Sequence, residues 1–269
     1  DLPPGPILGL GGGSAMDAAK WVHWRRGAPL WQVPSLPSVD ACFTHMVAVR
    51  DETGVHYSGD AIPEMVWVDF DLMREAPAHL VRGGIGDILS CHTARWDWEL
   101  AVSRGHDPAW DEESAAVSLR MVEDLRRLAE PIRSLSDDGL RGLMELHREI
   151  GKRCDDLTHA RFEEGSEHFF AYTFEFVTGR TIMHGELVCL GVLVMSAIQG
   201  NRPELAREIV VRTGVRHRLE ELGIAWSEVE ATLRELPAFV ERDGLWHSVA
   251  NGLEVTDRTL ATVRAALDA

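Results

Sequence analysis

The order of apolar and polar positions divides the chain into a first part with strand patterns and a second part with helical patterns. Short apolar runs between glycine, proline or polar turns predict buried strands at residues 7–10, 31–34, 46–49 and 65–69. From residue 71 onward, apolar positions recur at helical spacing, which predicts helices at roughly 77–103, 110–131, 136–153, 163–177, 182–199, 203–213, 226–236 and 256–268. We therefore predict an α/β unit over residues 1–70 and an all-α unit over residues 71–269.

A glycine-rich turn links the first predicted strand to a helix. The strand is followed by Gly11, Gly12, Gly13 and Ser14, and then by the helical run 15–20. Glycines let the backbone come close to a phosphate, and the amides of the first helical turn stabilise its charge. The turn lacks the spaced dinucleotide fingerprint, and such turns are structural about as often as they bind a nucleotide. By itself it is therefore a weak signal.

Composition narrows the class of protein. The chain has 269 residues, of which 45% are hydrophobic, so it can bury a large core in one or two domains. Its formal net charge of −16, with acids and bases interspersed, argues against nucleic acid and against an anionic membrane surface as partners. Small molecules are the expected partners, and we expect a homo-oligomer.

Cysteine spacing and the apolar runs point to a cytoplasmic protein. Cys42, Cys91, Cys154 and Cys189 are scattered and form no CxxC pair, which favours reduced thiols. The longest apolar run, around residues 187–198, is too short to span a bilayer, and the first residues do not resemble a secretory leader. We therefore expect a soluble protein that is not exported.

Two histidines stand in settings that favour a metal site. His168 follows Gly165-Ser166-Glu167, and His184 precedes Gly185-Glu186. Sixteen residues separate them, which is too many for one helical face but suits two successive elements that cross at one point. A third ligand, Asp87, lies at the start of a predicted helix. One carboxylate and two imidazoles fit zinc or ferrous iron with an open coordination position, although most of the 12 histidines must have ordinary roles.

Five segments in order carry a resemblance to a known superfamily: GGGSAMDAAK, PSLPSVD, GGIGDILSCHTARWDWELA, GSEH and HGELVCLG. They resemble the metal-dependent alcohol dehydrogenases and dehydroquinate synthases, and within that superfamily the sn-glycerol-1-phosphate dehydrogenases most of all. The matches extend over most of the chain, and GDILSCHTARWDWELA, GSEH and HGE are the specific part. The resemblance implies a Rossmann-like nucleotide domain followed by an all-helical domain, with the active site in the cleft between them.

The resemblance also assigns residues. The family's metal ligands fall on Asp87, His168 and His184, with Zn2+ favoured over Fe2+. The positions that contact NAD or NADP are Gly11, Gly12, Gly13, Ser14, Asp17, Ser35 and Ser38, with Lys20 in the same helix. Asp40 matches the aspartate on the substrate side, so it would hydrogen-bond a second hydroxyl while Ser38 or a water relays the proton. Asp17 and Lys20 also fit a solvated i, i+3 pair, and residues 96–98 fit a domain core.

The chain departs from the family pattern at three places. It begins at the glycine loop, whereas the family has a βα segment before it, so the nucleotide domain is expected to be partial. The hydroxyl-rich loop is changed to the run 35–40, and Phe162-Glu163-Glu164 replaces small uncharged residues. In the first turn of the helix 163–177, these glutamates would either point to solvent or oppose a phosphate-bearing substrate.

The resemblance predicts an NAD(P)H-linked, metal-dependent enzyme that interconverts a small polyol or hydroxy compound and its carbonyl. One alternative is a sugar-phosphate cyclase or lyase of the dehydroquinate synthase type. Those enzymes have a glutamate as first ligand and many active-site lysines, whereas this chain has Asp87 and few lysines. Another alternative is a metal-binding homologue without redox activity.

Overall fold

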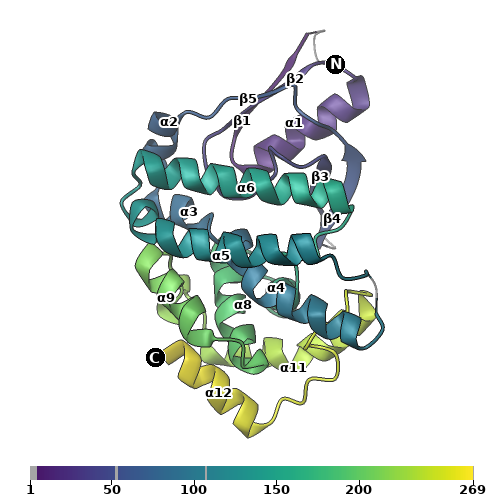
Figure 1. Cartoon of the computed structure of the whole chain (residues 1–269), viewed down its shortest axis with the longest axis vertical. Helices are drawn as coiled ribbons and strands as arrows, with labels where there is room; N and C mark the ends of the chain where they lie inside the picture. Colours follow the sequence, from purple (N-terminus) through teal and green to yellow (C-terminus); the bar gives the residue numbers. More distant parts are fainter. Residues whose placement is uncertain (1–4, 52–53, 107, 269) are drawn as a thin grey trace.

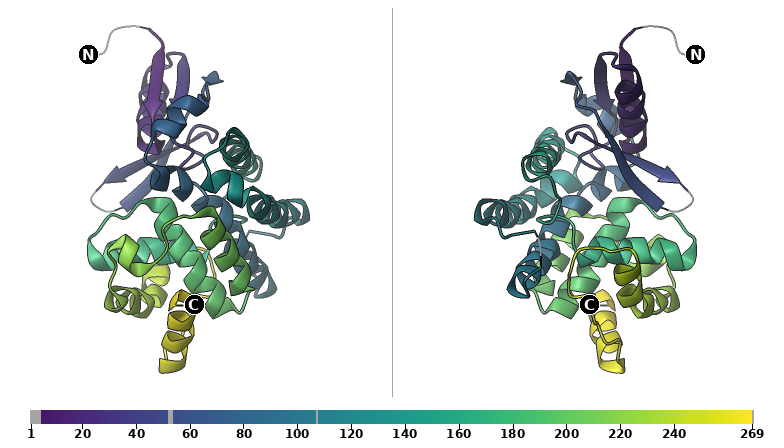
Figure 2. Two further views of the ribbon diagram at one scale, coloured as in Figure 1. Left: turned by 90° about the vertical axis from the view of Figure 1, so that its left-hand side faces the viewer. Right: turned by 90° about the vertical axis from the view of Figure 1, so that its right-hand side faces the viewer.

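A computed structural model of the chain describes residues 5–51, 54–106 and 108–268. The strands and helix α1 lie at one end of the molecule, and the remaining helices fill the middle and the other end (Figure 1). The last helix, α12, projects from the end opposite the strands (Figure 2). This arrangement follows the predicted order of strands first and helices afterwards.

The strands form a parallel sheet and a separate antiparallel ribbon. The sheet has the order β1-β2-β5, with β1 at Ile7–Gly11, β2 at Leu30–Pro34 and β5 at Met65–Val66. The ribbon pairs β3, Met46–Asp51, with β4, Gly54–Asp60. Because β1 and β2 run parallel, the turns that follow both strands meet at one edge of the sheet.

Helix α1, Gly13–Arg26, covers one face of the parallel sheet. Gly9 makes this close packing possible, since a Cβ there would lie 2.8 Å from Ala19 Cβ. Side chains of the opposite face are exposed, with Leu8 60% and Leu10 59% accessible, and Trp31 and Met65 beside them. Within the described residues, this small sheet is therefore covered on one side only.

Eleven further helices follow in the described ranges. They are α2 Phe70–Glu75, α3 Ala78–Gly83, α4 Gly86–Ser103, α5 Glu112–Arg133, α6 Asp137–Leu157, α7 Ser166–Thr178, α8 His184–Gln199, α9 Pro203–Thr213, α10 Leu219–Leu222, α11 Trp226–Arg242 and α12 Asp257–Asp268. Seven predicted helices are confirmed with small shifts of their ends. The expectation of one helix over 77–103 is wrong, because the chain breaks between α3 and α4.

The break lies at Gly84, where another segment of the chain approaches the backbone closely. A Cβ on Gly84 would collide with the carbonyl oxygen of Pro37, so the loop that follows β2 presses directly on the backbone there. Gly84 adopts φ −59° and ψ −7° after α3, and a new helix begins at Gly86. Consequently, Asp87 lies in the first turn of α4 instead of in the middle of a long helix.

Two apolar clusters stabilise the fold. The larger one combines buried residues of α4 to α9, α11 and α12, and α8 is buried continuously from Gly185 to Ser196. The smaller one joins Met16 of α1 and Cys42 to residues of α2, α3 and α6. Helix α6 therefore contributes to both clusters and lies between the strand end and the other helices (Figure 1). None of the described helices is long and apolar enough to cross a membrane.

Candidate metal centre

The three predicted ligands converge on one point. Asp87 Oδ1 lies 3.2 Å from His184 Nε2 and 3.6 Å from His168 Nε2, and one ligand atom of each residue lies within 4.8 Å of the others. Asp87 and His168 are buried, whereas the side chain of His184 is 36% accessible. The site is therefore enclosed on the Asp87 side and open beside His184.

The helices bring the ligands together through their first turns. Asp87, His168 and His184 begin or nearly begin α4, α7 and α8. A Cβ on Gly86 would come within 2.5 Å of Gly185 Cα, so α4 and α8 can meet this closely only because both positions are glycine. The glycines in the two motifs therefore set the distance between Asp87 and His184.

A glycine also allows close packing between α7 and α8. A Cβ on Gly191 would lie 3.2 Å from Glu167 Cα, one residue before His168. The close packing of α8 on the start of α7 thus fixes the second imidazole beside the first, and the two rings have centroids 5.3 Å apart. Glu186, two residues after His184, is fully buried and pairs with Arg216 through two contacts of 2.7 Å.

Glu167 orients the His168 imidazole. Its carboxylate is fully buried and accepts a hydrogen bond from His168 Nδ1 at 2.9 Å, another from Gly165 N at 2.6 Å and a third from Thr93 Oγ1 at 2.7 Å. A proton held on Nδ1 leaves the lone pair of Nε2 facing Asp87 and His184. We did not identify Glu167 from the sequence, although its position beside a candidate ligand was a usable signal.

The donor set fits a cation. Asp87 Oδ1 is buried and has no hydrogen-bond partner, although two imidazole nitrogens lie close to it. Burial by itself raises the pKa of Asp87, but His184 and His168 outweigh this effect and hold the pKa well below its ordinary value. A buried carboxylate oxygen without a hydrogen bond is costly, and a shared metal ion would satisfy it together with both Nε2 atoms.

The glycine turn and the loop after β2 lie together at the edge of the sheet. Ser35 N donates to Gly11 O at 2.8 Å, and a Cβ on Gly13 would lie 2.7 Å from Val39 Cγ2 and 4.0 Å from Ser38 Oγ. Helix α1 has no side-chain cap at Gly12 among the described residues, so its first amides stay available to an anion. The structure therefore brings the predicted turn and both serines to one place.

Asp40 lies in the same loop, two residues after Ser38. Burial raises the pKa of Asp40 to about 7, and the charge of Asp87 acts in the same direction while Lys20 opposes it. The loop itself is held by His147 of α6, whose Nε2 donates to Pro37 O at 3.1 Å. His147 is fully buried and was not identified from its sequence context.

Asp17 and Lys20 do not form the solvated pair that their spacing allowed. Lys20 is fully buried, and its ammonium contacts Asp17 Oδ1 at 3.2 Å and the carbonyl oxygens of Thr44 and Met46. Asp17 Oδ1 also accepts a hydrogen bond from Ala48 N at 3.1 Å. The pair therefore ties α1 to the start of β3, and the role of Asp17 toward a cofactor stays a prediction.

Asp97, a second buried acidic residue of α4, holds the backbone beside His168. It is fully buried and accepts hydrogen bonds from Ser166 N at 2.9 Å and Val249 N at 2.8 Å. Burial raises its pKa to about 6, and the charge of Glu167 adds to this effect. Trp98 is buried and donates to Pro108 O at 2.9 Å, so these residues form core, as expected.

Glu163 and Glu164 lie in the turn before α7, so the expectation that they occupy the first helical turn is wrong. The helix begins at Ser166 after the extended Gly165. Both glutamates are partly buried instead of fully exposed. Tyr172 Oη donates to Glu164 Oε1 at 2.9 Å, which holds this carboxylate over α7.

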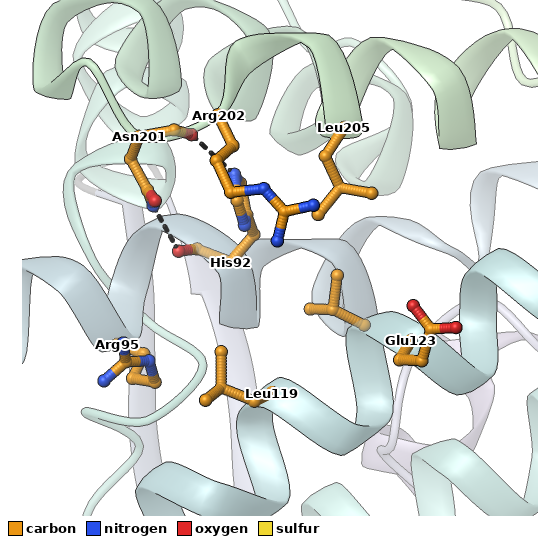
Figure 3. A pocket seen from close by; sticks show the side chains of 8 residues that line it. His92, Arg95, Leu119, Glu123, Asn201, Arg202 and Leu205 are labelled. Carbon is orange, nitrogen blue, oxygen red and sulfur yellow. Dashed lines mark hydrogen bonds between the residues drawn. The ribbon is translucent and has the colours of Figure 1, made fainter.

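A separate surface hollow of about 330 Å³ lies among α4, α5 and the start of α9 (Figure 3). His92 Nε2 donates to Asn201 O at 2.7 Å, and Asn201 Nδ2 donates to His92 O at 2.8 Å. None of the three candidate metal ligands lines this hollow. The reciprocal bonds hold the turn between α8 and α9, so we assign these residues a structural role.

Comparisons with known proteins agree with the motifs. No model of a protein family matches the chain. It is 28% identical over 222 residues to glycerol-1-phosphate dehydrogenase [NAD(P)+] of Hyperthermus butylicus, a match that covers 82% of the chain and 63% of the relative. The corresponding enzyme of Thermococcus kodakarensis is 29% identical over 221 residues, a match that covers 82% of the chain and 62% of that enzyme. The chain thus spans just under two thirds of the length of these relatives.

Solved structures show the same fold. A probable glycerol dehydrogenase from Sinorhizobium meliloti 1021 matches with a TM-score of 0.66 and 26% identity, over 97% of this chain and 75% of the other. Glycerol dehydrogenase from Schizosaccharomyces pombe matches with a TM-score of 0.73 and 20% identity, over 99% of this chain and 71% of the other. The chain therefore has the fold of the glycerol and iron-containing alcohol dehydrogenases. Its sequence is similar to the glycerol-1-phosphate dehydrogenases in particular, so the predicted resemblance is confirmed.

Proposed function

We propose that the chain forms the metal centre and part of the cofactor site of an NAD(P)-linked oxidoreductase. This enzyme interconverts a small polyol or hydroxy compound and its carbonyl. The observation that carries the proposal is the convergence of Asp87, His168 and His184 around a buried carboxylate oxygen without a hydrogen bond. Similarity to glycerol-1-phosphate dehydrogenases supports the redox reaction over other uses of such a centre.

Asp87, His168 and His184 would hold one divalent ion, with zinc favoured over ferrous iron. Such an ion supplies Lewis acidity, which stabilises negative charge on a substrate oxygen. Glu167 keeps the Nε2 lone pair of His168 directed at the ion, because it holds the proton on Nδ1. The accessible edge of His184 leaves a path for a substrate to approach.

Asp40 and Ser38 are the proposed proton-handling and substrate-orienting groups. A pKa of about 7 lets the Asp40 carboxyl accept or donate a proton at neutral pH, which suits general acid or base work. Ser38 lies in the same loop, beside the glycine turn. A substrate hydroxyl bonded to Asp40 would therefore lie between the cofactor edge and the metal centre.

The cofactor would bind at the edge of the parallel sheet. The amides at the start of α1 lack a side-chain cap and would hold the pyrophosphate, while Ser35 and Ser38 contribute hydroxyls. A nicotinamide cofactor supplies or accepts the hydride. We further propose that residues 1–70 act as the nucleotide-binding part and residues 71–269 as the metal-binding part, with substrate bound between them.

The test combines metal analysis with cofactor assays. We expect about one zinc or iron per chain by elemental mass spectrometry, and near-complete loss of metal in His184→Ala with the fold retained by circular dichroism. NADH or NADPH absorbance should change on addition of a small polyol or its carbonyl. Cofactor binding seen by fluorescence, with no net redox turnover, would favour a cyclase instead. Full metal retention by His184→Ala would refute the ligand assignment.

A further inference from the structure

The segment between β2 and β3, residues 35–45, carries Ser38 and Asp40 on turns and bends, without a regular helix or strand. Its backbone closes one turn, in which Asp40 O accepts hydrogen bonds from Phe43 N at 2.6 Å and Thr44 N at 3.3 Å. A segment of this kind has no sheet or helix ladder to hold it. The position of Asp40 therefore depends on the elements that the segment touches.

Helix α6 anchors the part of the segment that follows Asp40. A Cβ on Gly151 would lie 2.7 Å from the carbonyl carbon of Phe43, so the helix and the segment touch through their backbones. One turn further along α6, Asp155 Oδ1 accepts a hydrogen bond from His45 N at 3.2 Å and pairs with the His45 ring. This end of the segment is therefore fixed at two neighbouring points.

His147 anchors the part that precedes Asp40. Its Nε2 donates to Pro37 O at 3.1 Å. His147, Gly151 and Asp155 are spaced by four residues, so they lie on one face of α6. This face holds the segment on both sides of Asp40, and His147 is its anchor on the side of Ser38.

The imidazole of His147 is not fully satisfied in this place. The side chain is fully buried, and its Nδ1 has no hydrogen-bond partner in the described part of the chain. Burial lowers the pKa of His147, so the ring is neutral and its one proton is on Nε2. A buried polar atom without a partner is costly, and this cost offsets the gain from the bond to Pro37. Stability alone therefore does not explain a histidine at this position.

The carbonyl that His147 holds also abuts the helix of the metal centre. A Cβ on Gly84 would collide with Pro37 O, and α4 begins two residues later at Gly86. Asp87 follows in the first turn of α4. Pro37 O thus lies between His147 on one side and the start of the metal-binding helix on the other.

We propose, on the basis of the oxidoreductase function above, that His147 is a positioning residue of the reaction. Its bond to Pro37 fixes the distance between the metal centre and the groups that handle the proton, Ser38 and Asp40. Reacting groups must be held in a narrow range of geometry, and a displacement of about 1 Å can slow a reaction about 100-fold. His147 acts through the loop and does not itself touch the substrate.

Hydrogen exchange of the zinc-loaded full chain, followed by mass spectrometry, tests the anchor without turnover. His147→Leu removes the donor, whereas His147→Gln keeps an N–H that can bond to Pro37 O. We expect the amides of residues 36–44 to exchange about tenfold faster in His147→Leu, because the segment loses a hydrogen bond. His147→Gln should stay within about threefold of the unmodified chain. His147→Met takes the place of His147→Leu if that variant does not fold.

The kinetic readout is kcat for NADH or NADPH with a small carbonyl substrate. We expect His147→Leu to lower kcat about tenfold or more, and His147→Gln to restore it to within about threefold. Zinc affinity, measured by competition with a chelator, should stay within about twofold in both variants, because the three ligands are unchanged. Loss of kcat at constant zinc affinity, with rescue by glutamine, would not follow from a purely structural role.

His92→Leu is the matched control. His92 is also a buried histidine that donates from Nε2 to a distant backbone carbonyl, that of Asn201 at 2.7 Å. It borders the hollow between α4 and α9, which none of the residues 35–45 lines. This variant should leave kcat and the exchange of residues 36–44 unchanged.

Three results would each overturn the proposal: unchanged loop exchange in His147→Leu, a kcat of that variant within about twofold of the unmodified chain, or no rescue by His147→Gln. Loss of zinc affinity together with kcat would also overturn it, since the substitution would then disturb the whole site. If the unmodified chain changes neither NADH nor NADPH with any small polyol or carbonyl, the oxidoreductase function is refuted instead. The exchange data then still decide whether His147 anchors the loop.

Discussion

Replacing Glu167 with glutamine tests whether the residue behind His168 tunes the metal centre. Glu167→Gln keeps the shape of the side chain, so its amide oxygen can still accept hydrogen bonds from His168 Nδ1 and Gly165 N. The amide nitrogen then faces the hydroxyl of Thr93, which can rotate to accept a hydrogen bond. The substitution therefore removes the negative charge while it preserves the packing and the imidazole orientation.

The magnitude follows from the loss of a charge-assisted hydrogen bond. Hydrogen bonds to charged groups contribute about 1.5–3 kcal/mol, and neutral ones about 0.5–1.5 kcal/mol. Removal of the charge should therefore weaken zinc binding by about 1.4 kcal/mol, which is about tenfold in the dissociation constant. This agrees with the roughly 10- to 100-fold effects typical of residues that support metal-bound histidines.

The assay is competition for zinc between the metal-free protein and a fluorescent chelator. Glu145→Gln on the outer side of α6 serves as the control for net charge and should match the unmodified chain. Urea unfolding of the metal-free forms separates loss of metal affinity from loss of fold. A zinc affinity within about twofold of the unmodified chain, with the fold intact, would show that Glu167 is a structural residue only.

Two further predictions concern packing and pH. Gly84→Ala should destabilise the chain by about 1–3 kcal/mol in urea unfolding, because its Cβ would overlap the carbonyl of Pro37; an unchanged midpoint contradicts this. Burial raises the pKa of Asp97 to about 6 in the folded chain, against 3.8 for an ordinary aspartate. The folded state therefore holds this proton more tightly, which stabilises the fold below pH 4. About 3 kcal/mol of that stability is lost as the pH rises through 6. The difference in unfolding free energy between the unmodified chain and Asp97→Asn should follow that slope, and a flat difference would refute the assignment.

Local patterns pointed to the candidate ligands, and the resemblance to the metal-dependent alcohol dehydrogenases favoured them over the other histidines. Asp87, His168 and His184 each stand beside glycine in a short motif, and the structure brings all three together. The reason is that residue type limits metal binding to few side chains, and glycine marks the positions where backbones approach closely. The resemblance assigned the glycine turn, Ser35 and Ser38 to the cofactor site, and in the structure they meet at one edge of the sheet.

Strand β4 was not predicted from the apolar runs of the sequence. Its residues Gly54–Asp60 have little apolar alternation, because the strand belongs to a partly exposed two-stranded ribbon and not to a buried sheet. The helix break at Gly84 was missed for a different reason. Helical spacing continues across it, and the close approach of the Pro37 carbonyl, from the loop after β2, is visible only in the structure.

The least predictable features were the environments of charged side chains. Lysine and glutamate normally favour solvent, yet Lys20 and Glu167 are fully buried, and Glu164 bonds to Tyr172. Spacing along the chain tells which residues share one helical face, so it indicated the helices on which the candidate ligands lie. It does not tell which distant element covers that face, because that depends on how α1, α7 and α8 pack against segments far away in the sequence. The burial of Lys20 and Glu167 therefore became visible only when those helices were assembled.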